Sequence, residues 1–237
     1  MVHPGGQPIS TALSSVMIYL SRDDIPYEKL RDEVRTTFPT LDSIQQGPLL
    51  ASCHYLRACL DEAMRLVPPT PGPLWREVCA GGATIDGQHI PEGYEVAVDL
   101  YALHHNPSYF TDPDGFDPDR FMAKSTAEPT LKKPKFDYFP TSRANTIFPT
   151  SPSAISPNSF QGMYFPSTSV GKDHPAFAPF LLGPRSCVGK SLAYLEMSLT
   201  LARLIWSMDF RAADYGSVKS KPLLQFRGRQ DHGDRKS

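Results

Sequence analysis

Apolar residues recur at a spacing of three and four in two segments of the chain, which places them on one face of a helix. The members are Leu56, Leu60, Ala63 and Val67 in the first segment, and Leu192, Leu195, Leu199, Ala202 and Trp206 in the second. Gly47-Pro48 precedes the first segment and Pro68-Pro69 ends it, because proline cannot continue a helix. The pattern therefore predicts two amphipathic helices.

Shorter segments predict small β-sheets. Ala83–Ile85 and Gln88–Ile90 flank Asp86-Gly87, a dipeptide typical of a two-residue hairpin turn. Residues 94–100 are expected to form a strand, and residues 207–227 are expected to form terminal strands. The fold class predicted from these patterns is mainly α-helical with small β-sheets, that is α+β.

Composition narrows the class of protein. The 237 residues are 40% hydrophobic and carry a net charge of −1, so a basic surface for nucleic acid is not expected. The four cysteines show no C-x-x-C spacing, which favours a reducing, intracellular compartment. The most apolar early segment, Ala12–Leu20, is about half as long as a membrane span, so none is predicted in this chain.

Residues 123–172 differ from the rest of the chain. They contain 7 Pro, 8 Ser and 6 Thr and show neither helical nor alternating periodicity. Such a segment buries too little apolar area to offset its ordering entropy, so a mostly disordered surface insertion is predicted. Its scattered aromatic residues leave two readings open, a partner-binding loop or translated non-coding sequence.

The most specific chemical pattern is Phe180–Gly189, which reads F-x-x-G-x-R-x-C-x-G. Cys187 precedes the second amphipathic helix, where free N–H groups and the helix dipole stabilise a thiolate. Gly183 permits a backbone turn that a side chain would block. A lone cysteine near a helix start is usually a small buried apolar residue, but five defined positions at fixed spacing favour a chemical role for Cys187.

This pattern resembles the haem-ligand motif of the cytochrome P-450 family of haem-thiolate monooxygenases. The resemblance implies that Cys187 is the axial thiolate ligand of a haem iron and that Phe180 packs over the ligand loop. It also implies that Arg185 meets a haem propionate, that Arg76 is a second candidate for a propionate, and that Gly189 lets the helix start approach the porphyrin.

A second part of the resemblance lies elsewhere in the chain. Residues 62–65 read E-x-x-R on one helical face, and residues 116–121 resemble the family segment F-x-P-x-R-F. The family resemblance implies that Glu62, Arg65 and Arg120 form one buried charge cluster behind the haem. A buried charge is costly unless paired, so this cluster is expected to stabilise structure rather than take part in oxygen chemistry.

The resemblance covers nearly the whole chain, but only the C-terminal half of the family, and is nearest to fungal-type microsomal members. It departs from the family at the oxygen site, where Gln7 and Pro8-Ile9 align with an acid and a pair of hydroxyl residues. Neither Gln7 nor Pro8-Ile9 can relay a proton. Ser10 or Thr11 is the alternative source of a hydroxyl, and Pro8 is expected to begin a helix.

The function implied by the resemblance is monooxygenation of a small lipophilic substrate, with O2 and electrons from a reductase. A full-length member is expected at the endoplasmic-reticulum membrane. Residues 70–75 and 217–220 are the candidate substrate-lining segments, and Lys190 is interpreted as a solvated charge rather than a reductase contact.

Three alternatives to this function stand beside it. They are a haem-binding protein without turnover, an inert truncated fragment, and a hydrolase pairing Cys187 with His174 or His105. The hydrolase is set aside because nothing in the sequence places either histidine near Cys187. His104 and His105 are interpreted as surface or capping residues rather than metal ligands.

Overall fold

The computed structural model describes residues 3–122, 176–212 and 224–228 of the chain. The predicted insertion, residues 123–172, lies outside the described residues, as do His174 and the candidate substrate turn at residues 217–220. The described part contains helices and three small antiparallel sheets, which confirms the predicted α+β class.

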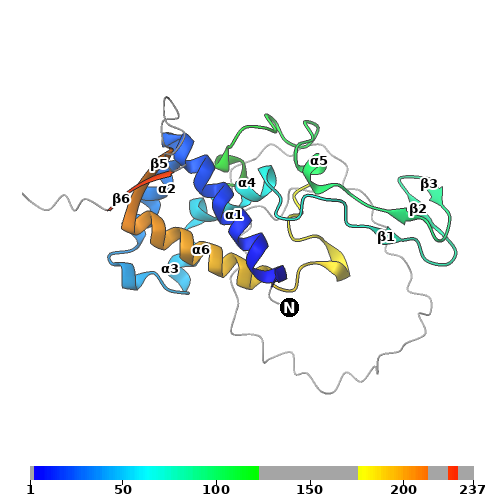
Figure 1. Ribbon diagram of the computed structural model, residues 1–237, viewed down its shortest axis with the longest axis horizontal. Coiled ribbons are helices and arrows are strands. Elements are labelled where there is room, and N and C mark those ends of the chain that lie inside the picture. The colour runs from blue at the N-terminus through cyan, green and yellow to red at the C-terminus, as the bar shows by residue number, and fades with distance from the viewer. Residues whose placement is uncertain (1–2, 123–175, 213–223, 229–237) are drawn as a thin grey trace, which may run out of the picture.

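A group of packed helices forms the core (Figure 1). Its elements are α1 (His3–Arg22), α2 (Asp24–Thr37), the 3-10 helix η1 (Leu41–Ser43), α3 (Pro48–Ser52), α4 (His54–Leu66) and α6 (Lys190–Ser207). Helix α4 packs against α1, α2 and α6. Its predicted apolar face is buried together with residues from the other helices, among them Val16, Leu30, Leu56, Leu60 and Leu201. The two predicted helices are therefore confirmed, and they meet in one core, but the apolar face predicted for α6 is wrong. Leu192 is exposed. The neighbouring face, with Tyr194, Met197, Leu201 and Ile205, is buried instead because α6 packs against α1, α2 and α4.

Helix α4 begins with help from a residue on another helix. Its N-cap, Cys53, makes no side-chain capping bond. Instead, the Glu33 carboxylate on α2 accepts the backbone N–H groups of Tyr55 at 2.9 Å and Leu56 at 2.8 Å. Two of the otherwise unpaired amide groups at the helix start are thereby satisfied, which fixes α2 against α4.

The end of α6 leads directly into a terminal sheet. Strand β5 (Met208–Ala212) pairs antiparallel with β6 (Leu224–Gly228), which confirms the terminal strands predicted from the sequence. The Arg35 side chain on α2 donates to the carbonyl of Ile205 and to Asp209, and Tyr27 also donates to Asp209. These bonds hold the junction of α6 and β5 against α2.

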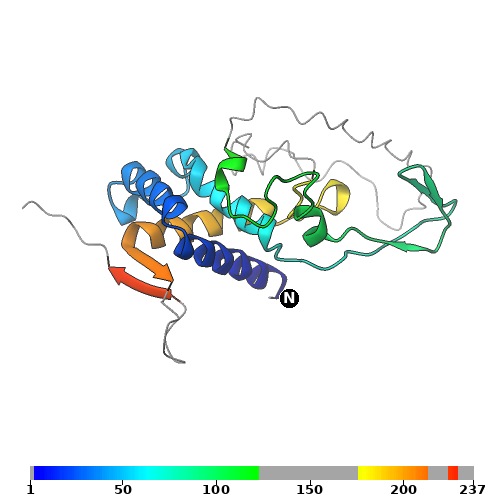
Figure 2. The same ribbon diagram turned by 90° about the horizontal axis from the view of Figure 1, so that it is seen from above.

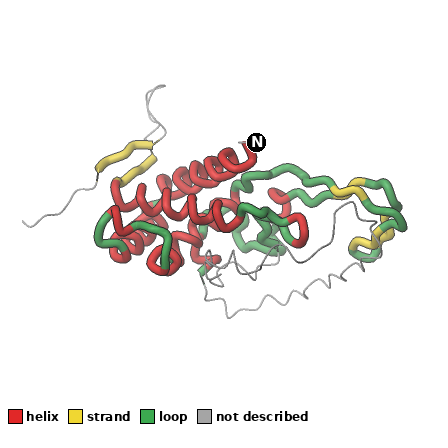
Figure 3. Tube along the Cα trace, turned by 90° about the horizontal axis from the view of Figure 1, so that it is seen from below, coloured by secondary structure: helices red, strands yellow, loops and turns green. Residues whose placement is uncertain are grey.

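The second part of the molecule extends away from the helices. Strands β1 (Arg76–Glu77) and β4 (Glu95–Val96) pair antiparallel, and β2 (Ala83–Ile85) pairs antiparallel with β3 (Gln88–Ile90). We call residues 76–96 the β extension. It lies on the side opposite β5 and β6 (Figures 2 and 3).

Within the β extension, one predicted turn is confirmed and one predicted strand is too long. Asp86 and Gly87 have φ values of 49° and 79°, as the tight hairpin turn requires. The strand predicted at residues 94–100 spans only Glu95–Val96. The reason is the helix α5 (Leu100–His104), whose N-cap Asp99 accepts the backbone N–H of Ala102. A capping aspartate starts the helix where the strand was expected to continue.

The start of α1 also differs from the prediction. Pro8 was expected to begin the helix, but α1 begins at His3 and Pro8 lies inside it. Proline removes one N–H from the helix, and here the carbonyl that loses its partner belongs to the first turn. The loss is confined to one hydrogen bond near a helix end, so the helix continues through Pro8.

Candidate haem-binding loop and its surroundings

The loop that carries Cys187 is closed by its own backbone. We call residues 180–189 the Cys187 loop. The Cys187 N–H donates to the Phe180 carbonyl at 2.9 Å, and the Ser186 N–H donates to the Gly183 carbonyl at 3.0 Å. Between them lies the 3-10 helix η4 (Gly183–Arg185). Gly183 has a φ of 71°, which a side chain disfavours, so the glycine is needed for this turn.

Cys187 lies at the start of α6 among apolar side chains that face solvent. It is a free, exposed cysteine two residues before the N-cap, Gly189. Leu182, Val188 and Leu192 are among the large apolar residues that are exposed. A Cβ added to Gly189 would lie 3.9 Å from the Cys187 sulfur, so the absence of a side chain at Gly189 leaves the space beside the thiol open.

These features fit a haem held through sulfur. A flat apolar macrocycle would cover exposed apolar side chains, and a helix N-terminus suits a thiolate. A structural zinc site needs about four ligands, but in the described ranges no three His, Cys, Asp or Glu side chains are grouped to hold a metal ion. A single protein thiolate suits a metal whose other ligands come from a porphyrin.

Phe180 connects the loop to the core. Its ring centroid lies 4.9 Å from that of Tyr194 on α6, and Lys190 Nζ lies 5.8 Å from the Phe180 ring. The Tyr194 hydroxyl donates to Asp61 at 2.7 Å, and the Arg57 guanidinium lies 3.2 Å from the Tyr194 ring centroid. The side of the Cys187 loop that faces the core therefore packs on a group of aromatic and charged residues.

Sequence analysis missed Asp61 and its partners. Asp61 is buried and forms an ion pair with Arg57, four residues before it on α4. Burial raises the pKa of Asp61, while Arg57 and the Tyr194 hydroxyl act in the opposite direction. The i,i+4 pair of opposite charges was the available signal for Arg57 and Asp61, but no local pattern indicates Tyr194.

The second predicted group of residues is brought together by ion pairs. We call Glu62, Arg65 and Arg120 the charge cluster. Glu62 and Arg65 have fully buried side chains, and Arg65 donates to the two Glu62 carboxylate oxygens at 2.7 and 2.8 Å. Arg120, in the 3-10 helix η2 (Pro118–Phe121), donates to Glu62 Oε1 at 3.1 Å.

Backbone groups complete the charge cluster. Besides its bonds to Glu62, Arg65 donates to the carbonyls of His104 at 2.9 Å, Pro113 at 2.6 Å and Gly115 at 3.0 Å. A guanidinium has five N–H groups, and all five of Arg65 therefore have acceptors. This arrangement locks α4 to the end of α5 and to the segment that follows it.

The two candidate propionate partners lie on different elements. Arg185 is exposed at the end of η4, within the Cys187 loop itself. Arg76 is exposed on β1 and donates to the Trp75 carbonyl at 2.8 Å. Figure 1 places β1 in the β extension, separate from the yellow segment that carries the Cys187 loop.

The interpretation of the two adjacent histidines is half right. His105 is the C-cap of α5, and its Nδ1 lies 2.9 Å from the Tyr101 carbonyl, so the capping role is confirmed. The surface role is wrong for His104, which is completely buried. Its Nε2 accepts the backbone N–H of Ala178 at 3.2 Å, a contact between residues 74 positions apart that no local pattern reveals.

The segment aligned with the oxygen site lies on α1. The hydroxyls of Ser10 and Thr11 both donate to the Gln7 carbonyl at 3.0 Å. The two hydroxyls proposed as substitutes are thus hydrogen-bonded to their own helix.

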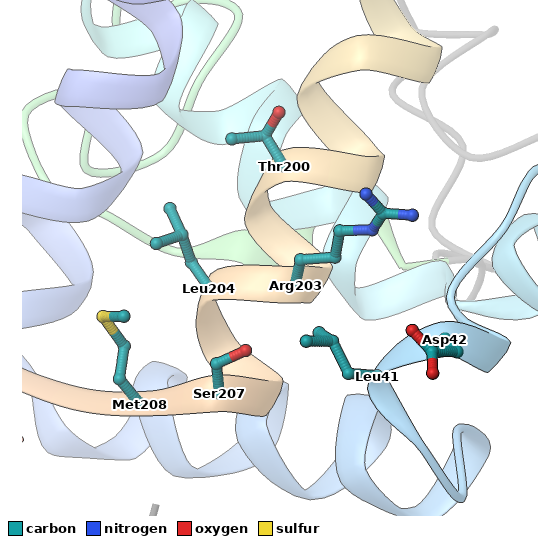
Figure 4. A pocket seen from close by; sticks show the side chains of 7 residues that line it. All are labelled: Leu41, Asp42, Thr200, Arg203, Leu204, Ser207 and Met208. Carbon is teal, nitrogen blue, oxygen red and sulfur yellow. The ribbon is translucent and has the colours of Figure 1, made fainter. Parts of the chain in front are cut away.

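A separate pocket of about 410 Å³ lies at the far end of α6 (Figure 4). It is lined by Leu41, Asp42, Thr200, Arg203, Leu204, Ser207 and Met208. Helix α6 has 18 residues, so at 1.5 Å per residue the two ends are roughly 27 Å apart. The pocket is therefore not part of the candidate haem site.

Among the helices that the structure describes, none is long and apolar enough to cross a membrane.

Comparison with known proteins gives one consistent result. The family model for cytochrome P-450 matches residues 4–142 and 155–225. The cytochrome P-450 monooxygenase poxM of Penicillium oxalicum is 36% identical over 240 residues, which cover 96% of this chain and 38% of that protein. The monooxygenase lcsN of Purpureocillium lilacinum is 38% identical, with 90% of this chain and 52% of lcsN covered.

The monooxygenase AKT7 of Alternaria alternata is 37% identical, with 90% of this chain and 34% of AKT7 covered. The chain thus spans between about a third and a half of the length of these three curated fungal relatives. Because the family model matches most of the residues, including the Cys187 loop and the charge cluster, the chain belongs to the cytochrome P-450 family.

Proposed function

We propose that the chain is part of a haem-thiolate monooxygenase in which Cys187 is the axial ligand of the haem iron. The observation that carries the proposal is the exposed Cys187 thiol at the start of α6, on a loop held by its backbone and flanked by exposed apolar side chains. The three fungal relatives are named monooxygenases, which supports the same class of reaction.

Four further residues of the Cys187 loop, together with Arg76 on β1, would help to hold the haem. Phe180 anchors the loop to the core through its packing against Tyr194. Gly183 shapes the turn, and Gly189 keeps the surface beside the sulfur free of a side chain. Arg185 and Arg76 would pair with the propionates, because a guanidinium matches a carboxylate in shape and charge. When bound, the haem supplies the O2 chemistry, and its thiolate ligand favours cleavage of the O–O bond.

The further reactants follow from the same assignment. The substrate is a small lipophilic molecule, O2 is the oxidant, and a reductase supplies the electrons. Residues 70–75, which include the exposed Trp75, are the described candidates for contact with the substrate. We place the complete protein inside the cell at the endoplasmic-reticulum membrane.

A second candidate function is haem binding without turnover. It is favoured by the amide of Gln7 and the ring of Pro8, which stand where the family has an acid and a hydroxyl residue. The Ser10 and Thr11 hydroxyls that could replace them are donors to the Gln7 carbonyl. A proton relay would therefore need those bonds to rearrange.

Haem titration of the purified chain tests the proposal. We expect saturable uptake and a thiolate-type carbon-monoxide band after reduction. Cys187→Ala should lose that band, whereas Cys79→Ala should keep it, because Cys79 is also exposed but lies outside the Cys187 loop. An unchanged band in Cys187→Ala would show that another group is the ligand, and failure of the unaltered chain to take up haem would indicate an inert fragment.

Turnover is then measured with added reductase. Product formed from a lipophilic substrate supports the monooxygenase. A thiolate-type band without product supports haem binding alone.

A further inference from the structure

We propose that His104 is a positioning residue for the Cys187 loop. Its side chain binds the segment that enters the loop, and its backbone carbonyl binds the buried charge cluster. The inference deepens the proposed function, since it concerns the loop assigned to the haem. It rests on contacts of described residues and can be tested without haem.

The backbone of His104 belongs to the charge cluster. Its carbonyl accepts from Arg65 Nη1 at 2.9 Å, and Arg65 is itself paired with Glu62. His104 is the last residue of α5, where carbonyl groups lack partners within the helix. The position of His104 is therefore fixed by the ion pair on α4.

The side chain of His104 reaches the other way, toward the loop. Its Nε2 accepts the backbone N–H of Ala178 at 3.2 Å, and the carbonyl of Ala178 accepts the Leu181 N–H at 3.0 Å. Phe180, between these two residues, accepts the N–H of Cys187 at 2.9 Å through its carbonyl. Three hydrogen bonds and a short stretch of chain thus connect the imidazole to the backbone of the cysteine.

Packing holds the imidazole in this position. The centroid of the Phe177 ring lies 5.6 Å from that of His104 and 4.7 Å from that of Phe121 in η2. Ala178 is buried beside them. Because solvent is excluded from His104 and Ala178, the Nε2 bond has little competition from water.

The protonation of the ring distinguishes the roles of its two nitrogen atoms. An Nε2 that accepts a backbone N–H carries no proton, so in the neutral ring the proton is on Nδ1. Nδ1 is buried and has no hydrogen-bond partner among the described residues. An apolar side chain of similar size would fill the space without burying a donor that lacks an acceptor. The Ala178 bond is what distinguishes histidine from such a residue here.

Three substitutions separate positioning from simple filling of the core. His104→Gln can place an amide oxygen near the position of Nε2, His104→Asn reaches only as far as Nδ1, and His104→Leu fills the space without an acceptor. His105→Gln is the matched control, because His105 is the adjacent residue and caps α5 rather than contacting Ala178.

The measurement is amide hydrogen exchange of the full chain without haem. We expect the Ala178 amide to exchange about tenfold faster or more in His104→Leu and His104→Asn, and within about threefold of the unaltered rate in His104→Gln and His105→Gln. Amides of α2 serve as an internal reference and should keep their protection in every variant. If His104→Leu does not fold, the contrast between the Gln and Asn variants decides the question.

Two results would overturn the inference. One is a protected Ala178 amide in His104→Leu or His104→Asn; the other is equal loss of protection in α2 and at Ala178, which would make His104 only a part of the core. Both results are independent of haem uptake. Failure of the haem titration therefore rejects the proposed function, whereas failure of the exchange pattern rejects the role of His104.

Discussion

The charge cluster and the Cys187 loop both rest on the helical core but differ in how they are completed. Glu62 and Arg65 have fully buried side chains, and protein groups satisfy every N–H of Arg65. Cys187 is exposed, and so are Leu182 and Val188 beside it. The cluster is thus complete within this chain, whereas the loop presents a thiol and apolar surface to a ligand. Stability should therefore depend on the cluster, and ligand binding on the loop.

The largest effect is expected from Arg65→Leu. The substitution leaves Glu62 buried with only Arg120 as a charged partner, and removing one member of a buried ion pair typically costs about 3–5 kcal/mol. Urea unfolding followed by circular dichroism measures the loss. Arg211→Leu is the control, because its ion pair with Asp24 at 3.4 Å is exposed and should contribute less than about 1 kcal/mol.

A second substitution identifies the cause. Replacing Glu62, Arg65 and Arg120 together by Leu removes all three charges, so the triple variant should be more stable than Arg65→Leu alone. Equal stability of Arg65→Leu and Arg211→Leu would show that the cluster does not dominate the stability of the chain.

An intermediate effect is expected from acid at His104, the residue between the two regions. Burial lowers the pKa of His104 to about 4. Above pH 6.5 the ring is neutral in both the folded and the unfolded chain, so pH has no effect through this group. As the pH falls from about 6.5 to about 4, the unfolded chain gains a proton that the folded chain does not, and stability is lost. Below about pH 4 the loss levels off because both states are protonated.

The size of this effect follows from the shift. Each unit of pKa difference corresponds to about 1.4 kcal/mol, so the total loss is about 3 kcal/mol. The free energy of unfolding of the unaltered chain and of His104→Gln is compared at several pH values, since the glutamine cannot titrate and other groups cancel. A constant difference between pH 7 and pH 4 would contradict a neutral, buried His104.

Local patterns in the sequence predicted part of the charge cluster and the hairpin of the β extension. The i,i+3 spacing of Glu62 and Arg65 predicted that they share a helical face, and the dipeptide at residues 86–87 predicted the hairpin. Both depend on neighbours a few residues apart. The strand predicted at residues 94–100 was too long because the capping potential of Asp99 was not weighed.

Contacts between distant segments could not be predicted in the same way. The bond from Ala178 to His104 spans 74 positions, and the bond from Tyr194 to Asp61 spans 133. Such pairs depend on how α4, α5 and α6 pack, which periodicity does not specify. Family resemblance implied roles for Cys187 and Arg65 but gave no indication that His104 connects the Cys187 loop to Arg65.

The smallest effect is expected when the same chemical change is made at an exposed and at a buried cysteine. Cys187→Ser should change the free energy of unfolding without haem by at most about 0.5 kcal/mol, because the residue is exposed. Cys59→Ser should cost about 1–3 kcal/mol, since Cys59 is fully buried on α4 and its hydroxyl replacement would lose contact with water. Adding haem should then stabilise the unaltered chain and Cys59→Ser but not Cys187→Ser, since only a ligand that binds the folded state raises stability. If haem stabilises Cys187→Ser as much as it stabilises the unaltered chain, the iron is held by another group, and the Cys187 loop is not the part of the molecule that binds the ligand.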